Sequence, residues 1–311
     1  MNAIELQHIT KTYNKGAVLA VDDVSFSVKE GEIFGLIGPD GAGKSSIFRL
    51  LTTLLIPDKG TAKVGGYDVV NDFKAIRGIV GYMPGRFSLY QDLSIEENLE
   101  FFATVFETTI EENYNLIKDI YVQLEPFKDR RAGKLSGGMK QKLALCCALI
   151  HKPKVLFLDE PTTGVDVVSR KEFWEMLKRL KKEGITILVS TSYMDEATMC
   201  DRIGLILEGK MLSIDSPEDI IKAYPEKLYG VKSASMYKLL TDLRAYQGTI
   251  NCYTFGEYMH LSMKVSEQEV LKYLHDKGHT DVELKSITPT VEDCFIQLLG
   301  QKHERDSNKN E

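Results

Sequence analysis

Between residues 38 and 46 the chain has the sequence Gly38-Pro39-Asp40-Gly41-Ala42-Gly43-Lys44-Ser45-Ser46. All but the last residue match the pattern G-x-x-x-x-G-K-[ST]. The preceding run EIFGLIG predicts a strand, and the following run SSIFRLLTTLL predicts a helix. Glycines let successive backbone N–H groups converge on an anion, and the helix adds the positive end of its dipole. We therefore expect this loop to bind phosphates, with Lys44 neutralising charge and the Ser45 hydroxyl ligating Mg²⁺; an ordinary glycine-rich turn is the alternative.

Strand and helix patterns alternate around this loop. VLFLD at residues 155–159 and ITILVS at residues 185–190 predict strands, and the amphipathic stretch Ser169–Glu183 between them predicts a helix. DRIGLILEGKMLSID at residues 201–215 predicts two strands joined by a tight turn at Glu208-Gly209. This alternation predicts an α/β fold with a mostly parallel sheet covered by helices.

The patterns also predict the division of the chain. Residues 1–217 form the α/β domain, with a helical insertion at about 86–150, within which residues 96–123 show helical periodicity alone. Residues 218–300 mix short strands with amphipathic helices and predict a small α+β domain. The polar residues 301–311 predict a disordered tail.

Composition excludes several classes of protein. The longest apolar run, Leu143–Ile150, is far shorter than the ~18 residues of a membrane helix, and the N-terminus does not resemble a signal peptide. The net charge of −6 argues against nucleic acid as a partner. The five cysteines have no spacing typical of a metal site or a redox pair, so we expect reduced thiols and a cytoplasmic protein.

Adjacent acids follow the apolar run at residues 155–158. Asp159 and Glu160 fall at the carboxyl end of this predicted strand, where open α/β sheets bind ligands. Asp159 is placed to hold Mg²⁺, and Glu160 is placed to polarise an attacking water as a general base. A solvated strand end without a catalytic role is the alternative.

A second glycine-rich segment has the sequence Leu135-Ser136-Gly137-Gly138-Met139. The run LALCCALI that follows is apolar nearly all round and predicts a buried helix. A buried helix whose glycine-rich N-terminus faces outward can hold a phosphate group. Ser136, Gly137 and Gly138 therefore predict a second anion site.

The ordered set of these segments, ending in KVLFLDEPTTGVD at residues 154–166, resembles the ABC ATPase family over about residues 4–217. The resemblance implies a P-loop NTPase fold with a parallel-sheet core, an antiparallel β subdomain and a helical subdomain. It implies ATP and Mg²⁺ as cofactors, and a dimer in which the LSGG signature of one subunit holds the ATP of the other. It also assigns Tyr13 to adenine stacking, with a plain edge-strand tyrosine as the alternative, and Asp166 to coupling of the two sites.

Two catalytic positions depart from the family pattern. The family normally has glutamine after the proline at residue 84 and histidine at residue 192, whereas this chain has Gly85 and Ser192. Gly85 has no side chain to ligate anything, and serine cannot become cationic. Because loss of one preorganised donor costs on the order of 10²–10³ in kcat, we predict firm MgATP binding with slow hydrolysis. Either a second, complete ATPase subunit does most of the turnover, or a homodimer is active enough, with a water or Gln91 filling the gap.

The chain also resembles the ATPase subunits of ABC-2 type exporters, on the segments LSGGM, TTGVD, YMDEA and ITPTVEDCFIQLL. This resemblance implies transmembrane permease subunits as partners, a location on the inner face of the membrane, and export of an undefined substrate. Residues 85–93 would line the groove for a permease helix, with Phe87, Leu89 and Tyr90 as candidate contacts. The alternatives are a non-hydrolysing regulatory subunit paired with a complete ATPase, and an ABC ATPase without a transport role.

Overall fold

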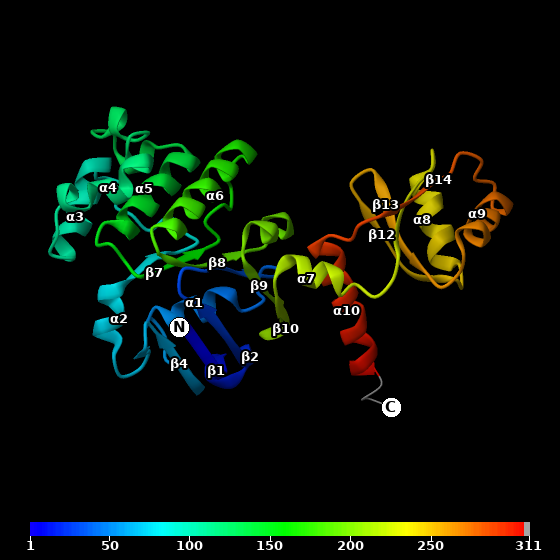
Figure 1. The fold of residues 1–311 in the computed structure, drawn as a ribbon, viewed down its shortest axis with the longest axis horizontal. Coiled ribbons are helices and arrows are strands. Elements are labelled where there is room, and N and C mark those ends of the chain that lie inside the picture. The colour runs from blue at the N-terminus through cyan, green and yellow to red at the C-terminus, as the bar shows by residue number, and fades with distance from the viewer. Residues whose placement is uncertain (308–311) are drawn as a thin grey trace. The chain divides into compact units, whose positions relative to one another are not determined.

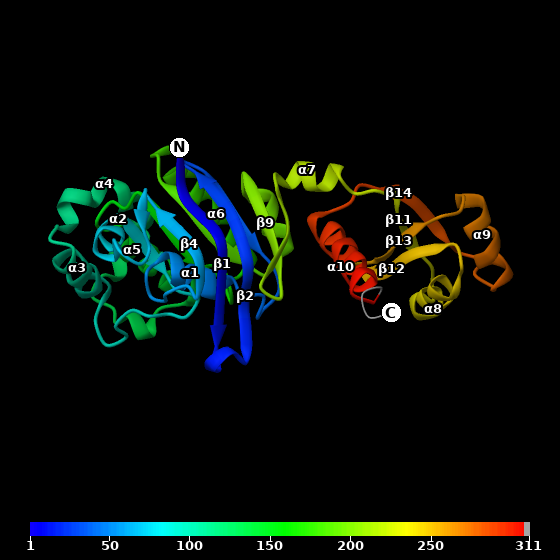
Figure 2. The ribbon, with the colours of Figure 1, turned by 90° about the horizontal axis from the view of Figure 1, so that it is seen from below.

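The computed structural model describes the backbone of residues 1–307 and the side chains of residues 1–300. The chain divides into two compact units, the first formed by Met1–Pro217 and the second beginning at Glu218. Figures 1 and 2 show the elements of each unit in two orientations.

A six-stranded sheet forms the centre of the first unit, with the strand order β10-β9-β3-β8-β7-β6. Its strands are β3 (Ile33–Ile37), β6 (Val80–Met83), β7 (Val155–Asp159), β8 (Thr186–Thr191), β9 (Arg202–Leu207) and β10 (Lys210–Asp215). Five of these strands run parallel to one another, and only the edge strand β10 is antiparallel to its neighbour β9. The expected parallel core is therefore confirmed.

The turn between β9 and β10 was expected at Glu208-Gly209, and the structure confirms it. Leu207 pairs with Lys210, and the two residues between them have φ values of 48° and 77°. Two successive residues with positive φ characterise the type I′ turn, whose twist matches that of a hairpin.

A four-stranded antiparallel sheet with the order β2-β1-β4-β5 packs beside the central sheet. Its strands are β1 (Asn2–Tyr13), β2 (Val18–Lys29), β4 (Lys59–Val64) and β5 (Tyr67–Asp68). The helices of this unit are α1 (Lys44–Leu51), α2 (Phe73–Ile79), α3 (Ile95–Val105), α4 (Ile110–Tyr121), α5 (Gly137–Leu149) and α6 (Val167–Lys182). Short 3₁₀ turns cover Asn14–Gly16, Glu125–Phe127, Ala132–Lys134 and Met194–Met199. Helices α3, α4 and α5 gather on one side of the unit as the expected helical insertion (Figure 1).

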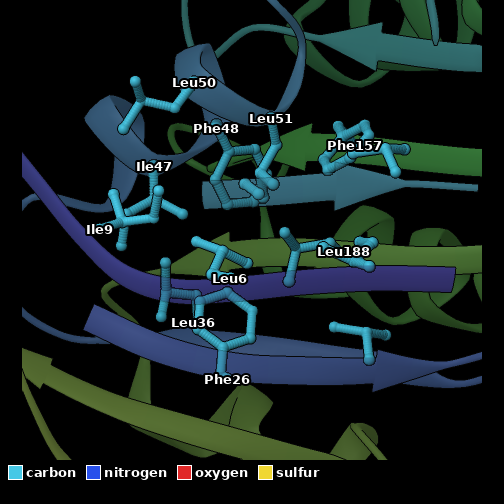
Figure 3. Packing of buried hydrophobic residues seen from close by; sticks show 14 of the residues in the cluster. Leu6, Ile9, Phe26, Leu36, Ile47, Phe48, Leu50, Leu51, Phe157 and Leu188 are labelled. Atoms are coloured by element: carbon cyan, nitrogen blue, oxygen red, sulfur yellow. The ribbon is translucent and has the colours of Figure 1, made fainter. Parts of the chain in front are cut away.

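Helix α1 is anchored in the core between the two sheets (Figure 3). Its Ile47, Phe48, Leu50 and Leu51 are fully buried, and the Phe48 ring meets the Phe157 ring of β7 edge to face with centroids 6.0 Å apart. Burying an apolar side chain of this size is worth about 1.5–3 kcal/mol. The start of α1, and with it the glycine loop, is therefore held firmly against the central sheet.

The second unit is a ferredoxin-like βαββαβ arrangement with the strand order β12-β13-β11-β14. After α7 (Pro217–Lys222) come β11 (Leu228–Lys232), α8 (Met236–Ala245), β12 (Thr249–Phe255), β13 (Tyr258–Met263), α9 (Glu267–Asp276), β14 (Glu283–Ile287) and α10 (Val291–Ser307). Helices α8 and α9 pack on one face of the sheet, and α10 lies on the other (Figures 1 and 2). The expected α+β character is confirmed.

One expectation for this unit is wrong. We expected disorder over residues 301–311, but α10 continues to Ser307. The physical reason is that Gln, Lys, Glu and Arg in this range are good helix formers, and adding residues to an existing helix is easier than starting one. Residues 308–311 lie outside the described part of the chain.

Candidate functional site

The glycine loop lies between the end of β3 and the start of α1, where the backbone has little space. A Cβ atom on Gly38 would lie 2.2 Å from the carbonyl oxygen of Ile206, and one on Gly43 would lie 2.3 Å from that of Ala20. Gly43 also has a φ of 103°, in the left-handed region that favours glycine. Both glycines are therefore needed for the shape of the loop.

Lys44 ties this loop to Glu160, the acid that follows β7. Its Nζ donates to the carbonyl oxygens of Gly38 at 2.7 Å and Pro39 at 3.0 Å, and lies 3.1 Å from Oε1 of Glu160. The Lys44 side chain is only 3% exposed. A buried ammonium group needs such partners, so bound phosphates would have to replace contacts that the protein now supplies.

The two acids at the end of β7 share a serine from the neighbouring strand. Ser190 Oγ donates to Asp159 Oδ1 at 2.6 Å and accepts from the backbone N–H of Glu160 at 2.9 Å. Asp159 is 5% exposed, and Glu160 has a φ of 50°, which is strained for a residue with a side chain. Ser190 therefore fixes both the Asp159 carboxylate and the turn that presents Glu160.

Sequence reasoning did not assign a role to Ser190. The signal that could have found it is pairing: β7 and β8 run parallel with Asp159 opposite Ser190. Parallel strands have their carboxyl ends at the same edge of a sheet, so the residues that end the two apolar runs would meet there.

Most of the expected phosphate-site residues line a single cavity of about 620 Å³. They are Asp40, Gly41, Ala42, Gly43, Lys44, Ser45, Ser46, Gly85, Asp159 and Glu160. Ala20, Arg49, Tyr82, Pro84 and Arg86, which sequence reasoning did not select, complete the lining. This volume lies within the range of small-molecule sites.

A wider groove of about 920 Å³ lies at the opposite ends of β7 and β8, bordered by α4 and α6. Its lining contains neither the glycine loop nor Asp159 and Glu160, so it is not the expected phosphate site.

The residues of the cavity fit Mg²⁺ bound together with a nucleotide. Mg²⁺ in such sites takes one or two protein oxygens and completes its shell with phosphates and waters. The Ser45 hydroxyl and the Asp159 carboxylate both line the cavity and can supply those oxygens. Among the described residues no group of three or more His, Cys, Asp or Glu side chains forms a closed metal site, and none is needed for this cation.

Tyr13 ends β1 and reaches the first turn of α1. Its hydroxyl lies 3.1 Å from Ser46 Oγ, and the ring is half-buried. This contact places the ring beside the helix that follows the glycine loop, although Tyr13 does not line the cavity itself. Its stacking on adenine stays a prediction.

The two positions that depart from the family pattern differ in their surroundings. Gly85 lines the cavity, and a Cβ there would lie 3.0 Å from the Asp159 carbonyl oxygen. Ser192 follows β8, is half-buried and does not line the cavity. Gln91 is exposed and outside the lining, and its backbone carbonyl accepts from Gly133.

The signature and the segment around Asp166 lie together, away from this cavity. Ser136 caps α5 by accepting from the backbone N–H of Met139 at 3.3 Å. Asp166 caps α6 by accepting from Val168 and Ser169, and the hydrogen bond from the Ser169 backbone lowers the pKa of the Asp166 carboxyl. A Cβ on Gly138 would lie 3.2 Å from Ser169 Oγ. The signature therefore faces solvent beside the start of α6 and does not reach the phosphate loop of its own chain.

No helix among the described residues has the length and apolar character needed to cross a bilayer. The five cysteines are buried and free, and burial raises the pKa of the Cys252 thiol to about 11.

Comparison with known proteins gives consistent matches. A family model described as ABC transporter matches residues 21–163. The chain is 39% identical over 285 residues to the probable multidrug ABC transporter ATP-binding protein YbhF of Escherichia coli K12, covering 90% of this chain but only 49% of that protein. It is 34% identical over 307 residues to the Nod factor export ATP-binding protein I of Rhizobium sp. N33, covering 97% of this chain and 99% of that one.

A solved structure with the same fold is the dimeric ATP-binding cassette MJ0796 in a post-hydrolysis state bound to ADP and Pi. It superposes with a TM-score of 0.62 at 25% identity, covering 68% of this chain and 98% of that one. These likenesses confirm the fold that the sequence predicted.

Proposed function

This chain belongs to the ABC transporter family as an ATP-binding subunit, and from that premise we propose that it binds MgATP in the cavity described above and powers export through partner permease subunits. The observation that carries the proposal is the convergence of the glycine loop, Lys44, Asp159 and Glu160 on one cavity. The chain spans about half the length of YbhF (49%), so that protein's activity and substrates do not transfer to it directly.

The glycine loop and the two acids each have a chemical task in this proposal. The backbone N–H groups of residues 40–46 and the Lys44 ammonium bind the phosphates. Ser45 and Asp159 hold Mg²⁺, which neutralises charge on the phosphates when bound. Glu160 polarises the attacking water as a general base.

The exposed signature supports a dimer with two nucleotides between the subunits. Because Ser136, Gly137 and Gly138 lie outside their own chain's cavity, they are free to contact ATP bound to another subunit. Asp166, next to them, is placed to couple the two sites. The partner is a second copy of this chain or a different ABC ATPase.

Export is the direction that the relatives' names support, since both the multidrug and the Nod factor proteins are named for export or drug transport. We propose ABC-2 type permeases as the membrane partners, with the part of the segment 85–93 that follows Arg86 facing them, and a place for this chain on the inner face of the membrane. The cargo is not encoded in this subunit.

A second candidate is a regulatory subunit with little or no hydrolysis, paired with a complete ATPase. Gly85 and Ser192 favour it, because neither can make the contacts of the usual glutamine and histidine.

Equilibrium binding of MgATP to the purified chain tests the central claim, with Lys44→Ala and, as a matched control, the exposed Lys118→Ala on α4. We expect Lys44→Ala to weaken ATP binding by about 10²-fold, since charge-assisted hydrogen bonds are worth about 1.5–3 kcal/mol each. Lys118→Ala should bind like the wild type. Absence of ATP binding to the wild type, or equal binding by Lys44→Ala, overturns the proposal.

Association with permeases needs a separate test. We expect a tagged chain to be recovered from detergent-solubilised membranes together with a multi-span protein encoded nearby. Recovery only from the soluble fraction would contradict the transport role and leave ATP binding untouched.

A further inference from the structure

Two cations of the nucleotide cavity have no role in the scheme above, and only one of them has a partner among the described residues of the protein. The lining contains three cationic side chains, Lys44, Arg49 and Arg86. Lys44 is held by the glycine loop and Glu160, and Arg49 interacts with the Tyr82 hydroxyl. Arg86 is exposed, and within the part of the chain that the structure describes it has no hydrogen bond, ion pair or ring contact. Its guanidinium is therefore available to a ligand.

Strand pairing brings the segment before Arg86 close to the acids at the end of β7. Strands β6 and β7 run parallel, with Met83 opposite Leu158. The chain then passes so close to β7 that a Cβ on Gly85 would lie 3.0 Å from the Asp159 carbonyl oxygen. The next residue, Arg86, lines the same cavity as Asp159 and Glu160.

The charge balance of the cavity favours a ligand-binding role for the Arg86 guanidinium. Three acidic side chains, Asp40, Asp159 and Glu160, oppose the three cationic ones. Without Arg86 the lining would carry a net negative charge before MgATP, itself an anion, arrives. Arginine stays protonated at any ordinary pH, and its planar fork of N–H donors matches two phosphate oxygens at once.

We propose that Arg86 contacts the γ-phosphate of bound ATP and so provides, from the neighbouring position, a contact that Gly85 cannot make. This inference rests on the proposed binding of MgATP in the cavity. It implies that Arg86 distinguishes ATP from ADP, because only ATP has the phosphate that the guanidinium binds. A contact of this kind would hold the γ-phosphate without taking part in proton transfer, which stays with Glu160.

The experiment compares equilibrium binding of ADP and of the non-hydrolysable β,γ-imido analogue of ATP, both with Mg²⁺, to the full chain. The variants are Arg86→Ala, Arg86→Lys and the matched control Arg179→Ala, which removes an exposed arginine paired with Asp119 outside the cavity. We expect Arg86→Ala to weaken the triphosphate about 10- to 100-fold and ADP by less than about twofold, as for loss of a charged hydrogen bond. Arg86→Lys should fall between, since lysine keeps the charge but not the fork.

Each other outcome is informative. If Arg86→Ala weakens the binding of both nucleotides equally, Arg86 acts only through the general electric field of the cavity. If the binding of both nucleotides is unchanged, Arg86 points to solvent or to a permease. Either result overturns the inference. Unfolding temperatures without nucleotide show whether Arg86→Ala is intact. If the wild type binds neither nucleotide, or Lys44→Ala binds as well as the wild type, the MgATP proposal fails instead.

Discussion

The two sides of the nucleotide cavity are built differently. On one side, the glycine loop, Lys44 and the acids of β7 are joined by short contacts, with Lys44 3.1 Å from Glu160 and Ser190 2.6 Å from Asp159. On the other side, Gly85 offers no side chain and Arg86 has no partner among the described residues. The first side is anchored through α1 and the central strands, whereas the second follows the short edge strand β6.

This difference separates two tasks that one cavity normally performs together. Most of the phosphate contacts belong to the anchored side, where the geometry exists before a nucleotide arrives. Hydrolysis also needs donors aimed at charge that develops during the reaction, and preorganised donors are the largest single catalytic contribution. We therefore predict that substitutions on the first side weaken ATP binding strongly. Adding the missing side chains on the second side should raise the rate of ATP hydrolysis.

The largest expected effect is on turnover after Glu160→Gln. Glutamine keeps the shape of glutamate but cannot accept a proton, so we expect ATP hydrolysis to fall about 10²- to 10⁴-fold while ATP binding persists. Phosphate release measures turnover, and size-exclusion chromatography with ATP should show an accumulated dimer. Glu111→Gln, an exposed acid on α4, is the control. Unchanged turnover after Glu160→Gln would mean that hydrolysis takes place at a partner's site.

Restoring the family residues tests the second side. Gly85→Gln combined with Ser192→His should raise kcat, by up to about 10²-fold if one preorganised donor is regained. The gain is limited by space, because the new Cβ would lie 3.0 Å from the Asp159 carbonyl oxygen. Gly85→Ala adds the same Cβ without the amide and is the matched control. Brisk turnover by the wild type, with no gain in the double variant, would rule out a slow site.

The same two sides explain what the sequence could predict. Residues 38–46, Asp159 and Glu160 belong to contiguous motifs whose strand–loop–helix context is local, so their convergence could be foreseen. Ser190 and Arg86 are harder to select, because their positions depend on which strands pair and in what register, which no single motif contains. The length of α10 beyond residue 300 was missed because polarity does not distinguish a disordered tail from the end of a helix of good helix formers.

Ser190→Ala probes how far the anchored side depends on strand pairing. The change leaves the buried Asp159 carboxylate and the Glu160 N–H without this hydroxyl, which should cost about 1–3 kcal/mol of unfolding free energy. It should also raise the Mg²⁺ concentration for half-maximal ATP binding about 10-fold, as removal of a group that orients a metal ligand does. Denaturant unfolding and Mg²⁺ titration measure the two effects. Ser190→Thr keeps the hydroxyl and should recover both; an unchanged Mg²⁺ requirement in Ser190→Ala would show that Asp159 does not need it.

The smallest expected effect concerns Asp166, whose two roles can be separated. Asparagine accepts the same hydrogen bonds from Val168 and Ser169, so Asp166→Asn should keep the cap of α6, whereas Asp166→Ala should lower the unfolding temperature slightly.

The cap should also depend on pH, because the pKa of the Asp166 carboxyl in the folded protein lies below its usual 3.8. The stability that the charged cap contributes is present above the pKa of the unfolded state and is lost as the pH falls through the pKa of the folded state. The stability advantage of wild type over Asp166→Ala should therefore shrink in acid. If Asp166→Asn is as stable as the wild type at neutral pH yet loses ATP-dependent dimerisation, the carboxylate acts across the subunit interface; if dimerisation is unchanged, Asp166 is a helix cap alone.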